Sequence, residues 1–220
     1  RNSQQLVSST STNTSTVTEM RKRNISFGSL DTKSGNAYYL GSQPDESLAQ
    51  NLQKLRDQKI NYEDVNHMVS STLDDPIAVT DANRKTIMNS FVKKESNILF
   101  GKHYKYAPQL STNSQMVYIE TGSLGDVYDK TAQLIFSISD DEVVGYTQTY
   151  VKKLIVLHEK QPVKSEKDVI TNLYANSEIP NNSKISYANL AYTKLLEAKD
   201  STIYIPVWFV TIKNKDSKVS

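Results

Sequence analysis

Ser90 and Lys93 have the Ser-x-x-Lys spacing of penicillin-recognising enzymes, in which the serine acts as a nucleophile. In those enzymes the serine stands at a helix start, where the N-terminal dipole and the lysine can activate it. Here the apolar pattern places Ser90 in the last turns of its helix, and the Ser-Asp-Asn and Lys-Thr-Gly elements are missing. The spacing therefore does not predict this enzyme class.

Adjacent carboxylates at Asp140, Asp141 and Glu142 suggest the acid and base of a glycosidase. Neighbouring carboxylates in a hairpin turn splay apart and stay solvated, so we expect a turn there instead of a catalytic pair. The same interpretation applies to Asp74 and Asp75, which precede a proline.

The three histidines, His67, His103 and His158, lack the close spacing of a helical metal site. Cysteine is absent, which excludes disulfides, thiolate metal sites and cysteine nucleophiles without identifying the compartment. We therefore predict no metal, no cofactor and no catalytic residue. The 26 basic and 24 acidic residues are interspersed and give a net charge of +2. The sequence therefore shows no cluster of basic residues of the kind that binds nucleic acid.

Residues 1–19 form a polar leader, and Ser8 to Thr18 is almost entirely Ser, Thr and Asn. Such a tract cannot bury enough apolar area to fold, so we expect a disordered tether, with an ordinary disordered terminus as the alternative. The longest apolar run, Ile203–Ile212, is too short for a membrane-spanning helix and contains Pro206. No transmembrane segment is predicted within these residues.

The elements of the N-terminal half begin with residues 24–30 and 36–41, which flank a turn signal and predict a β-hairpin. Asp45 predicts the N-cap of a helix whose face is formed by Leu48, Leu52 and Leu55. A second helix, the one that carries Ser90, starts near Thr80 or Asp81. Its apolar stripe consists of Ile87, Met88, Phe91 and Val92.

The middle of the chain is predicted to be an antiparallel meander of residues 103–110, 115–121, 131–139 and 143–157. In the third of these strands apolar side chains alternate with mostly polar ones, which indicates a sheet with one buried face. The alternating residues are Ala132, Leu134, Phe136 and Ile138.

Ser165 predicts the N-cap of a third helix, with Asp168 at its third position, and two strands over 184–195 and 202–213 follow. Both halves of the chain thus have a helix before antiparallel strands. We predict an α+β protein with twisted antiparallel sheets, about three helices and two similarly built lobes. The expected boundaries are a tether at 1–19, one lobe at 20–122 and a second at 123–220.

The chain is rich in tyrosine, with 13 in all, and has a single tryptophan. A docking surface for a protein partner is predicted around Tyr146, Tyr150 and Trp208, and packing of these rings in the core is the alternative.

Four segments between residues 145 and 213 form a distinctive series: Gly145–Tyr150 (GYTQTY), the helix from Asp168 to Tyr174 with Asn176 and Ile179-Pro180, Ala191-Tyr192, and Tyr204–Val210 (YIPVWFV). In order and spacing this series resembles the C-terminal half of the YycI family. The family usually continues into a further strand after the tryptophan strand, so we expect that strand to be missing or trimmed here.

The resemblance implies a membrane-anchored accessory protein that, with a YycH-like partner, regulates the WalK (YycG) sensor histidine kinase of the system that controls cell-wall metabolism in Gram-positive bacteria. It implies a single transmembrane helix before residue 1 and a domain on the extracellular face. We therefore expect a non-enzymatic adaptor. The alternatives are a stand-alone surface domain that binds a peptide or wall fragment and, from another class, a cell-wall hydrolase.

Overall fold

The computed structural model describes residues 15–215, which divide into two compact units. Unit 1 takes in residues up to Tyr38, 159–190 and those from Pro206 onward. Unit 2 takes in Tyr39–His158 and Ala191–Ile205. Each unit is thus built from segments that alternate along the chain. The two lobes that we predicted, 20–122 and 123–220, are instead continuous in sequence and have different bounds.

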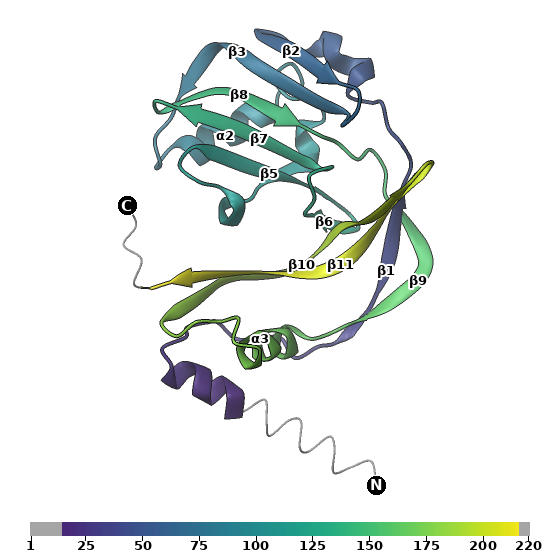
Figure 1. Cartoon of the computed structure of the whole chain (residues 1–220). Coiled ribbons are helices and arrows are strands. Elements are labelled where there is room, and N and C mark those ends of the chain that lie inside the picture. The colour runs from purple at the N-terminus through teal and green to yellow at the C-terminus, as the bar shows by residue number, and fades with distance from the viewer. Residues whose placement is uncertain (1–14, 216–220) are drawn as a thin grey trace. The chain divides into compact units, whose positions relative to one another are not determined.

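Most elements belong to unit 2 (Figure 1). In chain order they are η1 (Ala49–Lys54), β2 (Gln58–Glu63), β3 (Met68–Ala78), α2 (Arg84–Val92), η2 (Gly101–His103), β4 (Tyr104–Tyr106), η3 (Pro108–Leu110), β5 (Gln115–Gly122), β6 (Gly125–Val127), β7 (Gln133–Ser139) and β8 (Glu142–Gln148). Four strands pass from one unit into the other: β1 (Gly35–Ser42), β9 (Ile155–Val163), β10 (Ser183–Ala198) and β11 (Ser201–Asn214). Unit 1 also holds a helix over residues 15–22 and α3 (Glu166–Ala175).

The hydrogen-bonded strand order is β2-β3-β8-β7-β5-β6-β10-β11-β1-β9, with β4 paired to β5 outside this path. The pairs within the predicted meander, β5 with β7 and β7 with β8, are antiparallel. Tyr192 of β10 is paired in parallel with Val127 of β6, so the sheet is mixed. The α+β class is confirmed.

The core of unit 2 lies between α2 and the meander. Met88 of α2 is fully buried, and the ring of Phe91 meets the ring of Phe136 edge to face, with centroids 6.0 Å apart. Leu134 and Phe136 are also fully buried, as their alternation predicted. Burial of these apolar side chains supplies the main driving force for folding unit 2.

Asp140 and Asp141 form the two-residue turn between β7 and β8, with φ of 51° and 60°. A turn with two positive φ angles matches the right-handed twist of the flanking strands, and aspartate tolerates this conformation. The predicted turn is confirmed. Asp74 and Asp75 do not form the expected turn, because they lie within β3 where its register with β8 shifts between Thr72 and Ile77.

The hairpin predicted at residues 24–30 and 36–41 was wrong. Ser26 forms one isolated parallel bridge with Lys184, and β1 pairs instead with β11, where Leu40 lies opposite Tyr204. Both Leu40 and Tyr204 are 1% exposed, so burial with a distant segment overrides the local turn signal.

Other boundaries also differ from the prediction. The helix expected from Asp45 is reduced to the short 3-10 helix η1, although Asp45 Oδ1 does accept the backbone N–H of Ser47 at 2.9 Å. The strand expected over 143–157 is two strands, β8 and β9, separated by residues 149–154, and the hairpin β2–β3 was not predicted.

Residues 1–14 of the predicted tether lie outside the described residues, and residues 15–19 belong to the helix over 15–22. Met20 fixes this helix in unit 1, because its fully buried side chain packs in one apolar cluster with Ile25 and with Ile170 of α3. Residues 15–19 therefore belong to a packed helix, whereas the sequence predicted a disordered tether up to residue 19.

Ser165 caps α3 as predicted, since its hydroxyl accepts the backbone N–H of Asp168 at 3.1 Å and is itself buried. We expect Ser165→Ala to lower the free energy of unfolding by about 1 kcal/mol and the melting temperature by about 2–4 °C, because a buried helix donor loses its acceptor. Differential scanning calorimetry measures this loss. Ser34→Ala, at an exposed serine, is the matched control, and equal melting temperatures for the two variants would contradict the capping role.

Candidate functional site

The residues that suggested enzyme chemistry come from separate elements of unit 2: Ser90 from α2, and Asp140 and Asp141 from the turn between β7 and β8. Ser90 is exposed near the end of α2, and its hydroxyl donates to the carbonyl of Thr86 at 3.2 Å. Its position is therefore not the helix start that activates a nucleophilic serine.

The histidines are likewise dispersed. His67 has a positive φ in the turn between β2 and β3, while His103 lies at the end of η2 with its ring against that of Phe100. His158 lies in β9. Among residues 15–215, no group of three His, Asp or Glu side chains is placed to hold a metal ion.

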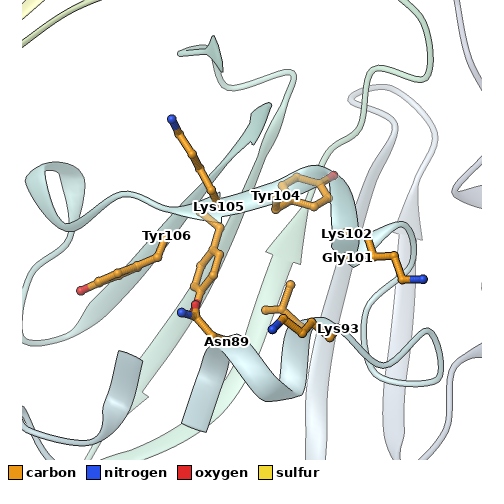
Figure 2. A pocket seen from close by; sticks show the side chains of 9 residues that line it. Asn89, Lys93, Gly101, Lys102, Tyr104, Lys105 and Tyr106 are labelled. Carbon is orange, nitrogen blue, oxygen red and sulfur yellow. The ribbon is translucent and has the colours of Figure 1, made fainter. Parts of the chain in front are cut away.

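Unit 2 contains a cavity of about 480 Å³ between the end of α2 and the strand pair β4–β5. We call it the lysine groove, because three lysines line it: Lys93, Lys102 and Lys105. Its other lining residues are Asn89, Val92, Gly101, Tyr104, Tyr106 and Tyr118. Figure 2 shows Asn89 and Lys93 on the helix side, with Lys102, Lys105 and Tyr106 coming from the segment that crosses above it.

The aromatic wall of the groove is held in place by the core. The hydroxyl of Tyr118 donates to Asn89 Oδ1 at 2.8 Å, and the rings of Tyr106 and Tyr118 lie with centroids 5.4 Å apart. Burial raises the pKa of Tyr118, so its hydroxyl stays protonated at neutral pH and remains a donor to Asn89.

The three lysines differ in their partners. Lys105 Nζ lies 2.5 Å from Asp126 Oδ2, whereas Lys93 and Lys102 form no ion pair with a carboxylate among the described residues. Lys93 and Lys102 are both exposed. Two of the lysines that line the groove are thus not engaged by a carboxylate of residues 15–215.

Gly101 allows the η2 segment to approach α2 closely. A Cβ at this position would lie 1.8 Å from the carbonyl oxygen of Val92. Any residue with a side chain would therefore clash there unless the backbone moved. The absence of a side chain at Gly101 therefore sets the spacing of this end of the groove.

A buried polar network adjoins the groove at Tyr104. The Tyr104 hydroxyl donates to the carbonyl of Thr149 at 2.5 Å, and Glu120, opposite Tyr104 in the β4–β5 pair, accepts the backbone N–H of Val151 at 2.9 Å. Gln148 donates to the carbonyl of Leu99 at 2.7 Å. The bonds of Tyr104 and Glu120 hold Thr149 and Val151, which begin the segment of residues 149–154 where the chain passes from β8 to β9. We call this segment the connector.

Glu120 is buried, with 6% of the residue exposed. Desolvation raises its pKa from 4.5 to about 8, against the opposing effect of the Val151 hydrogen bond. Glu120 is therefore mostly an uncharged acid at neutral pH, which reduces the cost of burying it.

The three predicted partner-binding residues fall in different environments. Tyr146 is 2% exposed, and its hydroxyl donates to Gln58 Oε1 at 2.7 Å, so it packs the core as the alternative interpretation held. Tyr150 is half-buried, with its ring stacked on that of Phe100 at 4.5 Å. Trp208 is half-buried in unit 1, where its indole N–H donates to the carbonyl of Lys164 at 3.1 Å.

Sequence analysis did not identify the groove or the network. Lys102, Lys105 and Glu120 belong to no recognised motif, and Asn89 and Tyr118 are 29 residues apart. The available signal was the concentration of lysine and tyrosine between Lys102 and Tyr106.

We expect the stability of the protein to fall as pH rises from about 4.5 to about 8, because over this interval the unfolded chain loses the Glu120 proton while the folded chain keeps it. Glu120→Gln retains an acceptor for Val151 and cannot ionise. The variant should therefore gain stability over the native chain progressively across this interval, as measured by melting temperature against pH.

Glu142→Gln, at an exposed glutamate, is the control and should leave the pH dependence unchanged. A Glu120→Gln curve that runs parallel to the native curve from pH 4.5 to 8 would show that Glu120 is already ionised in the folded state.

The sequence matches the model of the YycI protein family over residues 3–220. A comparison with curated proteins found no match. Among solved structures, YycH from Bacillus subtilis is similar at a TM-score of 0.50 and 15% identity, over 83% of this chain and 52% of YycH, so this chain spans about half the length of YycH.

Two further structures are less similar. An uncharacterized protein from Eubacterium rectale has a TM-score of 0.42 and 7% identity, over 86% of this chain and 80% of that one. The C-terminal domain of Bacillus megaterium YpeB has a TM-score of 0.32 and 12% identity, over 79% of this chain and 90% of that one.

The family match covers nearly the whole chain and thus extends the resemblance seen at residues 145–213 through the N-terminal half. The likeness to YycH supports the α+β fold. The chain therefore belongs to the YycI family.

Proposed function

We propose that this protein is a non-enzymatic, extracytoplasmic regulator that binds a YycH-like protein and, with it, modulates a WalK-type sensor histidine kinase. The observation that carries the proposal is the family match over residues 3–220. YycI-type proteins are regulators of the WalK system, and the likeness to YycH is consistent with two related folds acting together.

The proposed mechanism is a bias between kinase states. A regulator shifts a two-state equilibrium only by as much as its contacts differ in free energy between the two states. The ectodomain and its partner would supply contacts that one signalling state makes better than the other. No covalent chemistry is needed for this role.

The proposed location is the extracellular face of the cell membrane, with a single transmembrane helix before residue 1 as the anchor. No helix within residues 15–215 combines the length and apolarity needed to cross a bilayer.

Co-purification from membranes tests the proposal directly. Full-length protein tagged at its cytoplasmic end should retain both a YycH-like protein and a WalK-type kinase, identified by mass spectrometry after mild detergent extraction. An unrelated single-pass membrane protein with the same tag is the control. Recovery of intact bait with neither partner would contradict the adaptor role.

Substitutions of Trp208 test whether its side chain stabilises the fold or contacts the partner protein. We expect Trp208→Ala to lower the melting temperature by several degrees, because a half-buried indole and its hydrogen bond to Lys164 are both lost, and Trp208→Phe to lower it less. Partner recovery per folded molecule should stay unchanged in both. A Trp208→Ala variant with native melting temperature and no bound partner would instead place Trp208 in the interface.

A further inference from the structure

We propose that the lysine groove binds a small anionic sugar, that is, a sugar ring that carries a phosphate or carboxylate group. This activity is separate from partner binding. It would make the protein a receptor for a soluble or wall-derived ligand in addition to an adaptor.

The size and lining of the groove suit such a ligand. Its volume of about 480 Å³ lies within the range of small-molecule sites, which combine apolar and aromatic walls with a few fixed polar groups. Tyr106 is half-buried and supplies aromatic surface against which the C–H face of a sugar ring can pack, while the buried rings of Tyr104 and Tyr118 support it from behind. The Asn89 amide and the Tyr106 hydroxyl supply hydrogen bonds for sugar hydroxyls.

The charge of the groove selects for an anion. Lys93 and Lys102 have no carboxylate partner among the described residues, and Lys105 shares its charge with Asp126. Glu95 is an acidic residue near Lys102, but its carboxylate is already paired with Lys54 Nζ at 2.8 Å. The balance at the groove is therefore positive, and an ammonium hydrogen bond to an anion is about twice as strong as a neutral one.

The groove is largely pre-formed, which reduces the entropy lost on binding. The Tyr118–Asn89 hydrogen bond fixes one wall, and the close approach of Gly101 to Val92 fixes one end. Only the lysine side chains must become ordered. Figure 2 shows that Lys102 and Lys105 extend in different directions, so a ligand would draw flexible side chains inward over a rigid base.

The test is an NMR titration of the ¹⁵N-labelled 220-residue chain with four probes: glucose 1-phosphate, glucuronate, glucose and inorganic phosphate. The first two should cause saturable shifts of the Asn89 side-chain amide and of the backbone amides of residues 101–106. Glucose and inorganic phosphate should bind at least tenfold more weakly, since glucose lacks the anionic group and inorganic phosphate lacks the sugar ring. The comparison of glucose 1-phosphate with glucuronate shows whether phosphate or carboxylate is preferred.

The matched variants are Lys93→Gln with Lys102→Gln, and Lys59→Gln on β2 as the control, because all three lysines are exposed and their replacement should leave the fold intact. The double variant should weaken binding of the anionic sugars at least tenfold, while the control should not change it. Unshifted amides at millimolar sugar, equal binding of glucose or of phosphate alone, or unchanged binding in the folded double variant would each overturn the proposal.

Discussion

The hydrogen bonds that Tyr104 and Glu120 make to the connector are the constraint on which unit 2 depends. Residues 149–154 leave the sheet between β8 and β9, and Thr149 and Val151 are both buried, so their backbone groups cannot be satisfied by bulk water. Tyr104 and Glu120 lie opposite one another in the β4–β5 pair and supply one donor and one acceptor to the connector. A buried backbone group without a partner would cost about 1–3 kcal/mol, so neither bond is dispensable.

The same strand pair forms the wall of the lysine groove. One residue after Tyr104, Lys105 lies opposite Ile119, and Tyr106 lies opposite Tyr118. Tyr104 itself belongs to both features, since it lines the groove and its hydroxyl holds the connector. The short β4–β5 strand pair thus sets both the geometry of the groove and the path of the chain out of the meander.

The sequence predicted those features whose causes are local. The turn at Asp140 and Asp141 follows from residues that tolerate positive φ, and the start of α3 follows from the hydroxyl of Ser165. The alternation at Leu134 and Phe136 also identified the buried face of β7 correctly, because one strand carries its own pattern.

The features that could not be predicted depend on residues far apart in the chain. The pairing of Leu40 with Tyr204 joins residues from opposite ends of the sequence, and no local pattern near Leu40 predicts it. Glu120 looks like a solvated strand residue until Val151 is placed beside it. A three-residue strand such as β4 is also too short for periodicity to show, although it carries Tyr104 and a third of the residues that line the groove.

Hydrogen exchange of the Val151 amide tests this account most directly, because that N–H is the donor to Glu120. If the β4–β5 pair holds the connector, Val151 should exchange as slowly as the Ile119 amide in β5, through opening of the whole core. Exchange of Val151 as fast as that of Lys199 in the exposed turn between β10 and β11 would contradict the account and show that the connector is free of the core.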